Sequence, residues 1–428
     1  MTTHRIAILD GLRTPFAKSA GALRDIGADD LAASLVSELI DRTGVDGTAV
    51  DEVIFGNVAQ PTHAANIARV IALKAGLPND VIAHTVHRNC ASGMQAITAG
   101  ALQIMSGRAD VVIAGGTESM SQIPLLFGDD MTKMFIRLMR ARTLRQRAAV
   151  LLGFRPSHLK PIIALQLGLT DPICGLNMGQ TAEVLARDFG IDRETQDAFA
   201  LQSHLRALAA AERLADEILP VTGPPRYDHM TCGDDGPREG QSMAQLAKLR
   251  PYFDRAAGTV TVGNACPVTD GAAAVILCSE RRARSMGIEP LGFLGSWEYA
   301  ALDGKRMGLG PVHAAAKLID RTGCRLDDFD LVEINEAFAA QVLANVRAFD
   351  SRDYAKQHLN RSTALGSIGP DRLNVNGGAI ALGHPVGATG TRLVVTLLKE
   401  MKRRGAERGL ATLCVGGGQG AALSLEAA

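Results

Sequence analysis

The chain has 428 residues, of which 46% are hydrophobic and 45 are glycine, a composition typical of a multidomain α/β protein and unlike that of a disordered chain. Lys plus Arg equals Asp plus Glu at 45 each, so no overall charge draws the protein to nucleic acid, and we expect no such partner. Seven cysteines without close pairs argue against a disulfide framework and a zinc cage, which favours a reducing, cytoplasmic compartment and predicts no bound metal.

Predicted strands and helices alternate along the chain. A strand is expected at residues 6–10, and the segment before it lacks the charged and apolar regions of a signal peptide. Apolar runs at residues 111–114, 272–277 and 410–415 predict buried strands, and residues 97–105 show a helical pattern. No apolar run reaches about 18 residues, so no transmembrane helix is expected. The alternation predicts α/β layering.

A hexapeptide is repeated within the chain. L-I-D-R-T-G occurs at residues 39–44 and again at residues 318–323, and the same offset aligns Asp51 with Asp330. Six identical residues predict that two halves of the chain share one fold.

The two halves also share an order of segments around chemically reactive residues. Cys90, a helical stretch and D-V-V-I-A-G-G at residues 110–116 correspond to His384, a helical stretch and L-A-T-L-C-V-G-G-G at residues 410–418. Each half is therefore predicted to run strand, reactive turn, helix, strand.

Cys90 is the candidate nucleophile. It follows T-V-H-R-N and precedes A-S-G-M-Q-A-I, which places it at the end of a strand and the start of a helix. The positive end of a helix, together with a nearby imidazole, lowers the pKa of a thiol from about 8.5 towards working pH. The alternative is that Cys90 is a small core residue.

About 130 residues after Glu118 form an insertion between the halves, which predicts a three-part architecture. Its segment 131–160 is basic, with no acidic residue before Asp171, and carries apolar residues at helical spacing. A basic amphipathic helix is predicted, with apolar residues Met131, Met134, Phe135, Leu138 and Met139 and basic residues Lys133, Arg137, Arg140, Arg142, Arg145, Arg147, Arg155 and Lys160. Recognition of a membrane or a partner is favoured over a solvated cover with its apolar face in the core.

His384 is the candidate base. It lies in N-V-N-G-G-A-I-A-L-G-H-P-V-G-A-T-G at residues 374–390, where glycines would let the backbone approach a ligand, and a helix is expected over residues 391–401. Asn335 follows a predicted strand at residues 330–334, where its amide would orient a water or donate into an oxyanion hole, with Glu336 as a buttress. Asn335 is equally consistent with a simple helix cap.

Cys414 ends a buried strand and opens the glycine turn C-V-G-G-G-Q-G. If the duplicated halves face each other, its thiol would reach the cavity of Cys90, and Gly416 would offer its N–H. One thiol as nucleophile and one as proton carrier suits acyl transfer through a thioester by a ping-pong mechanism. Structural cysteines are the alternative.

Taken together, these motifs resemble the thiolase family. The resemblance runs nearly end to end and rests on N-C-A-S-G-M, M-G-Q-T-A-E, A-K-L-R-P-Y-F, G-N-A-C-P-V-T-D-G-A-A-A, N-E-A-F, the glycine-histidine motif and C-V-G-G-G-Q-G in this order. It implies an α/β fold of two βαβαβαββ halves in an α/β/α/β/α core. The halves would comprise residues 1–120 with 250–285 and residues 286–428, and residues 121–249 would form a loop domain that includes the basic insertion (131–170).

The resemblance also implies residue roles. Cys90 would take the acyl group, His384 would activate it, and Cys414 would protonate the departing acetyl-CoA carbanion. Asn335 with His384 would form one oxyanion site, and the N–H groups of Cys90 and Gly416 the other. Coenzyme A would be a substrate lying across the loop domain, with no permanently bound cofactor, and its contacts would include Met178, Cys266 and Phe338.

The chain departs from the common family pattern at two places. Cys266 and Pro267 stand where many members have Ser-Gly, and Asn177 stands where some have His. These differences put the coenzyme A contacts in doubt, and the missing His favours longer acyl chains.

The basic insertion and the tract at residues 349–361 are similar to the thiolase subunit of the fatty-acid β-oxidation trifunctional complex. This similarity implies degradative cleavage of 3-ketoacyl-CoA in a dimer or tetramer. It also implies contact of residues 131–170 with a membrane or with an α subunit that carries hydratase and dehydrogenase activities.

Three alternative functions are compatible with part of the sequence pattern. A biosynthetic acetoacetyl-CoA thiolase shares the chemistry and differs in the depth of its tunnel. A decarboxylating ketoacyl synthase would not need the second thiol. A catalytically silent acyl-CoA-binding scaffold would not need four polar catalytic positions.

Overall fold

Most strands join one sheet. The computed structural model describes residues 5–224 and 227–428, so the predicted domain start at residue 1 lies outside the described residues. The sheet has the order β12-β13-β14-β11-β1-β10-β5-β3-β4, with β2 paired to β10. The strands of this sheet are β1 (Ile6–Arg13), β2 (Ala17–Lys18), β3 (Glu52–Gly56), β4 (Ile82–Val86), β5 (Val111–Glu118), β10 (Thr269–Ser279), β11 (Gly292–Ala301), β12 (Leu331–Ile334), β13 (Arg408–Val415) and β14 (Gln419–Ala427).

The predicted duplication is visible in the strand pairing. In the first half β3 is parallel to β5, and β5 is antiparallel to β10. In the second half β12 is parallel to β13, and β13 is antiparallel to β14. The hexapeptides end the matching helices α1 (Ala28–Thr43) and α12 (Gly310–Thr322), and each helix stops at a glycine of positive φ, Gly44 at 67° and Gly323 at 71°. The two halves therefore share one fold, as the echo predicts.

The core has the predicted α/β/α/β/α layers. Helices α3 (Ser92–Met105) and α16 (Val386–Arg404) lie in the centre, where their apolar residues pack with β5 and β10 on one side and β13 and β14 on the other. Helices α1 and α2 (Ile67–Lys74) cover the first sheet half, and α12 and α13 (Ala339–Asp350) cover the second. The two halves are joined edge to edge, because Ile6 to Ile8 of β1 pair with Gly292 to Leu294 of β11.

Two of the glycines near His384 lie in a helix that begins earlier than predicted, and they pack against neighbouring backbone. Helix α16 begins at Val386, five residues before the predicted start, and so contains Gly387 and Gly390. A Cβ at Gly390 would lie 2.6 Å from the backbone nitrogen of Met94 in α3, and a Cβ at Gly116 would lie 1.9 Å from the carbonyl oxygen of Gly387. These glycines let the two central helices and β5 touch through their backbones.

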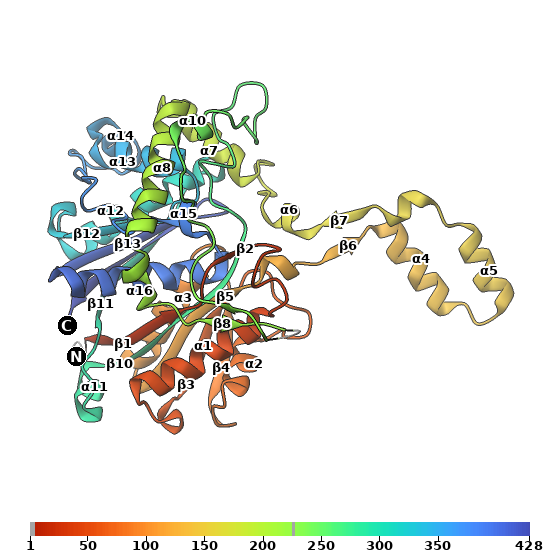
Figure 1. Ribbon diagram of the computed structural model, residues 1–428, viewed down its shortest axis with the longest axis horizontal. Helices are drawn as coiled ribbons and strands as arrows, with labels where there is room; N and C mark the ends of the chain where they lie inside the picture. The colour runs from red at the N-terminus through yellow and green to blue at the C-terminus, as the bar shows by residue number, and fades with distance from the viewer. Residues whose placement is uncertain (1–4, 225–226) are drawn as a thin grey trace.

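The insertion contains a projecting arm (Figure 1). A two-stranded ribbon, β6 (Leu125–Phe127) and β7 (Pro161–Ile163), carries α4 (Asp129–Arg140) and α5 (Leu144–Leu152) away from the body. Met131 and Met134 are buried within the arm, whereas Phe135 and Met139 are exposed. The amphipathic helix is confirmed, and the alternative of a cover with its apolar face in the core is wrong.

The other elements complete the insertion and the connections between the layers. They are α6 (Ala164–Gly168), α7 (Met178–Asp188), α8 (Arg193–Ala209), α9 (Ala211–Ala215), β8 (Val221–Thr222), β9 (Met230–Thr231), α10 (Met243–Leu246), α11 (Glu280–Met286), α14 (Arg352–His358), α15 (Ala379–Leu382) and the 3-10 helices η1 (Gly47–Ala49), η2 (Met120–Gln122), η3 (Pro156–Leu159), η4 (Gly304–Leu309) and η5 (Leu326–Asp328). Among the described residues, none of the helices combines the length and the apolar character needed to cross a membrane.

Candidate active site

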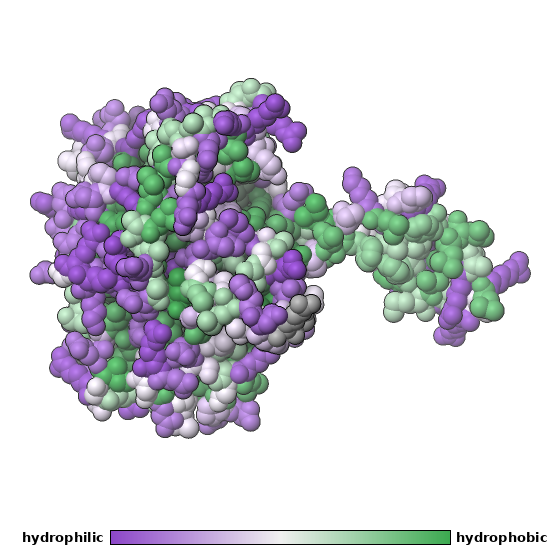
Figure 2. Space-filling view, viewed as in Figure 1, coloured by the Kyte–Doolittle hydropathy of each residue, from purple (hydrophilic) through white to green (hydrophobic). Residues whose placement is uncertain are grey.

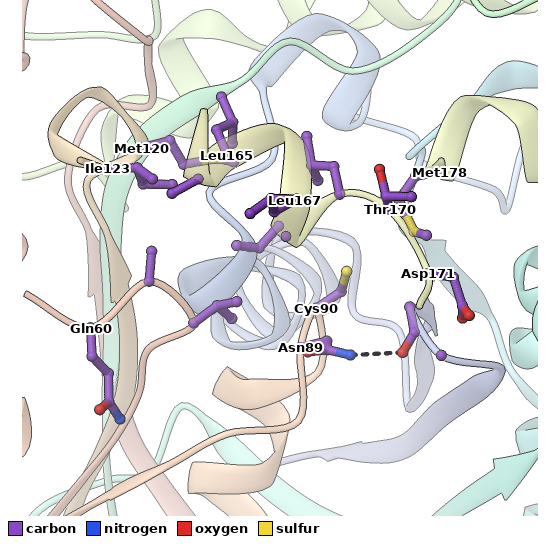
Figure 3. Close-up of a pocket in the computed structure, with 18 of the residues that line it drawn as sticks. Gln60, Asn89, Cys90, Met120, Ile123, Leu165, Leu167, Thr170, Asp171 and Met178 are labelled. Carbon is purple, nitrogen blue, oxygen red and sulfur yellow. Dashed lines mark hydrogen bonds between the residues drawn. The ribbon is translucent and has the colours of Figure 1, made fainter. Parts of the chain in front are cut away.

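Cys90 faces a large cavity. Strand β4 ends at Val86, a tight turn follows, and α3 begins at Ser92, so the chain presents Cys90 between a strand and a helix as predicted. The cavity has a volume of about 1210 Å³, and its wall near Cys90 includes Asn89, Met178 and Gly416 (Figure 3). A cavity of this size accommodates a molecule with a long flexible arm.

The cavity continues from Cys90 into an apolar gallery at the root of the arm. Side chains from β6 and α6, and from η2 and the residue after it, line this part of the cavity. The gallery residues are Met120, Ile123, Leu126, Leu165 and Leu167. Such a surface suits an aliphatic chain, because it removes apolar area from water without requiring hydrogen bonds.

The Cys90 thiol is neutral at rest, which corrects the predicted direction of its pKa shift. Burial raises the pKa of Cys90, and the N–H of Gly416 opposes this only in part. Desolvation therefore outweighs the helix N-terminus, and the thiol needs a base to remove its proton.

His384 has the tautomer of a base. Its Nδ1 lies 2.7 Å from Oγ1 of Thr389, and that hydroxyl donates its own proton to the carbonyl oxygen of Pro385 at 2.9 Å. Nδ1 must therefore be the donor to Thr389, which leaves a lone pair on Nε2. Burial and the positive charge of Arg392 lower the pKa of His384 to about 3, so the imidazole is neutral near pH 7.

The rate of Cys90 alkylation by iodoacetamide is expected to rise about tenfold per pH unit through pH 8.5, since a raised thiol pKa keeps the thiolate a minor species at neutral pH. Peptide-level mass spectrometry would separate Cys90 from the exposed Cys232. A rate that levels off below pH 7 would contradict the neutral thiol and would indicate a thiolate–imidazolium pair.

Asn335 and His384 are brought together, as predicted. Asn335 Nδ2 lies 3.5 Å from His384 Nε2, while Asn335 Oδ1 is buried and has no partner among the described residues. Glu336 acts as a buttress of the histidine loop: its carboxylate accepts hydrogen bonds from Ser203 at 2.6 Å and from Asn374 at 2.8 Å. Oδ1 of Asn335 is therefore a free acceptor that can take a hydrogen bond from a water, while the donor Nδ2 faces His384 Nε2.

Cys414 lies near Cys90 but is not among the residues that line the cavity, which corrects the prediction that its thiol reaches it. It is buried in a cluster with Phe338 and Ala337, and Met178 packs against the same cluster. Burial raises the pKa of Cys414 well above its usual value, and the nearby thiols of Cys90 and Cys266 raise it further. Three sulfur atoms thus share one electrostatic environment.

The three predicted coenzyme A contacts differ in position. Met178 lines the cavity, whereas Cys266 and Phe338 do not, and Phe338 packs with Met178 in a buried cluster. The N–H of Cys266 donates to the carbonyl oxygen of Ala337 at 3.0 Å, and burial raises the pKa of its thiol to about 12. The Asn177 side chain is committed to the capping box of α7 through the N–H of Gln180 at 2.9 Å.

Two residues that the sequence did not single out organise the site. Thr389 sets the tautomer of His384, as described above. Glu118 accepts hydrogen bonds from the N–H groups of Val58, Ala59 and Gly387, and burial raises its pKa to about 7. Spacing alone does not reveal either residue, because both act through contacts between distant segments.

A buried neutral imidazole, a thiol at the cavity wall and a second thiol near it define an enzyme of the acyltransferase class. Family models described as "Thiolase, N-terminal domain" and "Thiolase, C-terminal domain" match residues 6–281 and 288–427. The chain belongs to the thiolase family.

Relatives resemble the chain over its whole length. A "3-ketoacyl-CoA thiolase" of Serratia proteamaculans (strain 568) is 44% identical over 431 residues, covering 100% of this chain and 98% of that protein. The same name describes a Pseudoalteromonas translucida (strain TAC 125) protein that is 43% identical, covering 99% of this chain and 97% of the relative.

Solved structures agree with this assignment. Bacillus anthracis acetyl-CoA acetyltransferase has a TM-score of 0.86 and 38% identity, with 99% of each chain covered. Human mitochondrial 3-ketoacyl-CoA thiolase in complex with CoA has a TM-score of 0.85 and 35% identity, covering 99% of this chain and 98% of that one.

Proposed function

We propose that the protein is a 3-ketoacyl-CoA thiolase, an acetyl-CoA C-acyltransferase of fatty-acid β-oxidation. It would cleave 3-ketoacyl-CoA with coenzyme A into acetyl-CoA and an acyl-CoA two carbons shorter. The observation that carries the proposal is that Cys90 lines the same cavity as the apolar gallery residues. The names of full-length relatives at 42–44% identity support it. Coenzyme A is the second substrate, and the reaction needs no resident cofactor or metal.

The first half-reaction forms an acyl-enzyme. His384 Nε2 removes the proton of the Cys90 thiol, and the sulfur attacks the 3-keto carbon. The bond between carbons 2 and 3 breaks, and Cys414 protonates the acetyl-CoA carbanion. The raised pKa of Cys414 suits this role, since it keeps the proton on sulfur until the carbanion forms.

The second half-reaction returns both thiols to their resting state. The Cys414 thiolate takes the proton of the coenzyme A thiol, and the resulting thiolate attacks the Cys90 thioester. Cys90 leaves as a thiolate and recovers its proton from His384. We assign one oxyanion site to Asn335 with His384 and the other to the N–H groups of Cys90 and Gly416.

We assign the two halves and the loop domain separate tasks. Residues 1–120 with 250–285 would carry the nucleophile, and residues 286–428 would carry His384 and Cys414. Residues 121–249 would cover coenzyme A, with Met178 lining the cavity and Cys266 and Phe338 nearby.

The apolar gallery favours an acyl chain longer than that of acetoacetyl-CoA. An acetoacetyl substrate ends one methyl group beyond its keto carbon and would leave the gallery empty. The alternative is a biosynthetic acetoacetyl-CoA thiolase, which the likeness to an acetyl-CoA acetyltransferase of 38% identity favours.

Thiolysis of substrates of increasing length tests the function and the gallery together. Wild-type kcat/KM is expected to rise with chain length, and Leu165→Trp is expected to lower it at least about tenfold for 3-ketohexadecanoyl-CoA by filling the gallery. Turnover of acetoacetyl-CoA should change by less than about twofold, since differences in fit act on the atoms that occupy the pocket. The matched control is Leu205→Trp on the exposed side of α8. A tenfold wild-type preference for acetoacetyl-CoA would establish the biosynthetic alternative instead.

The projecting arm is proposed to bind an anionic membrane surface. Its apolar side chains are bare, including Met139 at 86%, Leu144 at 83% and Leu152 at 88% exposure, and Figure 2 shows apolar surface along its length. Its eight basic residues are exposed, and none forms an ion pair within the part of the chain that the structure describes. Apolar insertion combined with a cationic surface fits the boundary between headgroups and acyl chains, and would place a cytoplasmic enzyme at the membrane.

Co-sedimentation with vesicles is expected to show binding at low salt when phosphatidylserine is present. Raised salt should weaken it, because the Debye length falls to about 8 Å at physiological ionic strength. The triple variant Met139→Ser, Leu144→Ser, Leu152→Ser should lose binding and keep its kcat. Absence of lipid binding at low salt would remove the membrane proposal and leave an α subunit with hydratase and dehydrogenase activities as the partner.

A second copy of the chain is proposed to pack on β4, where the sheet ends. Ile82 of β4 is exposed, and α3 beside it exposes Leu102 and Met105. An apolar sheet edge with free backbone groups is a surface for pairing. Sedimentation equilibrium should give a dimer or tetramer for the wild type and a smaller species for Ile82→Lys; a monomeric wild type would contradict the proposal.

A further inference from the structure

Asn89, the residue before Cys90, has a left-handed backbone. Its φ is 43°, and it is one of five non-glycine residues with positive φ among those the structure describes. The others are Ala20, Tyr227, Asn360 and Asn374, and Asn89 alone of the five lines the cavity. Unusual backbone conformations persist where surrounding contacts impose them, and they gather at functional sites.

The contact that accompanies this conformation is a hydrogen bond across the cavity wall. Asn89 Nδ2 donates to the carbonyl oxygen of Gly416 at 2.7 Å (Figure 3). Gly416 opens the turn that follows Cys414, and its N–H stabilises the Cys90 sulfur. The side-chain amide of Asn89 therefore ties the nucleophile loop to Gly416, the residue whose N–H lowers the pKa of Cys90.

Few side chains contact Gly416 on the side that faces Asn89 and Met178. Gly416 and Gly417 carry no side chains, and a Cβ at Gly416 would meet only Met178 Sδ at 3.4 Å and Asn89 Nδ2 at 3.7 Å. The carbonyl oxygen of Gly416 belongs to the peptide that follows the one carrying its N–H. Holding this oxygen limits the movement of Gly416, which joins the two peptides and as a glycine is conformationally free.

Arg88 also connects the nucleophile loop to the end of the glycine turn. Its NH1 donates to Gln419 Oε1 at 3.1 Å, and its guanidinium lies 4.1 Å from the ring centroid of Tyr299. Because Arg88 already connects the nucleophile loop to the strand after the glycine turn, the hydrogen bond of Asn89 is needed only to position Gly416.

We infer that Asn89 is a positioning residue that aims the Gly416 N–H at the Cys90 sulfur and so sets the rate of acylation. The inference rests on the proposed thiolase reaction for its effect on turnover. Its effect on the thiol is independent of any acyl-CoA.

Three variants separate the backbone from the side chain. Asn89→Gly keeps the left-handed conformation and removes the amide, Asn89→Asp keeps the shape and places an acceptor against the carbonyl oxygen, and Asn89→Ala loses both features. Asn89→Gly and Asn89→Asp are each expected to lower kcat about 10- to 100-fold with KM changed by less than about twofold, because a misaligned donor affects the transition state more than the ground state. The matched control is Asn360→Gly, which removes an amide at an exposed position of similar φ and should leave kcat unchanged.

Alkylation of Cys90 by iodoacetamide provides the second readout. Each of the two variants is expected to alkylate more slowly than wild type at pH 8, since a displaced N–H stabilises the thiolate less. Wild-type alkylation and wild-type kcat in Asn89→Gly, at an unchanged melting temperature, would overturn the inference. If wild type cleaves no 3-ketoacyl-CoA, the proposed function fails, and slower alkylation of the variants would still support the positioning role.

Discussion

Cys90→Ala is expected to lower thiolysis by at least about 10⁴-fold, because removing a covalent nucleophile closes the acyl-enzyme route. Cys90 lines the cavity together with Gly416, and the base that we propose for it is the neutral His384. Intact-mass measurement after mixing with an acyl-CoA should show one acyl group on wild type and none on the variant.

Cys174 provides the matched control for this experiment. It also lines the cavity, and it lies on the loop after Asp171, whose carboxylate accepts a hydrogen bond from the Cys174 N–H at 2.9 Å. Cys174→Ala should keep full turnover and acylation. Loss of acylation in Cys174→Ala with retention in Cys90→Ala would move the nucleophile to that loop, and turnover in Cys90→Ala would show that the assigned site is wrong.

Cys414→Ala is expected to separate the two halves of the reaction. Without the acid, cleavage of the carbon–carbon bond should slow by about 10²–10⁴-fold, the usual contribution of one general acid. Acylation of Cys90 by a simple acyl-CoA should survive, since that step forms no carbanion. Stopped-flow thiolysis and intact-mass acylation measure the two effects separately.

Cys278→Ala controls for the loss of a buried sulfur. Cys278 lies in the core strand β10, and burial raises its pKa to about 12 without any contact with the cavity. Its replacement should lower stability and leave both half-reactions intact. Equal loss of acylation and cleavage in Cys414→Ala would indicate that Cys414 supports the fold and carries no proton.

The strands were predictable because their residues are buried on both faces. Residues 111–114, 272–277 and 410–415 lie inside β5, β10 and β13, where continuous apolar runs are required. The repeated hexapeptide was equally informative, since each copy ends a helix at a left-handed glycine. Local sequence determines such features, and the duplicated fold follows from them.

The sequence predictions failed, or could not be made, where contacts between residues distant in the sequence determine the property. The helix N-terminus suggested an acidic Cys90, but burial by residues remote in sequence raises its pKa. The periodicity of Met131 and Met134 identified an amphipathic helix, yet it does not say what covers the apolar face, and Phe135 proved to be exposed. The tautomer of His384 depends on Thr389 and Pro385 in three dimensions.

The pairing of β1 has a consequence for synthesis of the chain. Strand β1 lies between β10 and β11, so both of its neighbours are encoded more than 250 residues later. At about 5–20 residues per second, the first strand waits roughly 13–50 s on the ribosome before either partner emerges. Its unpaired edges are exposed throughout this interval, and closing so long a loop makes folding slow. The nascent chain should therefore depend on chaperones until residue 279 has left the exit tunnel.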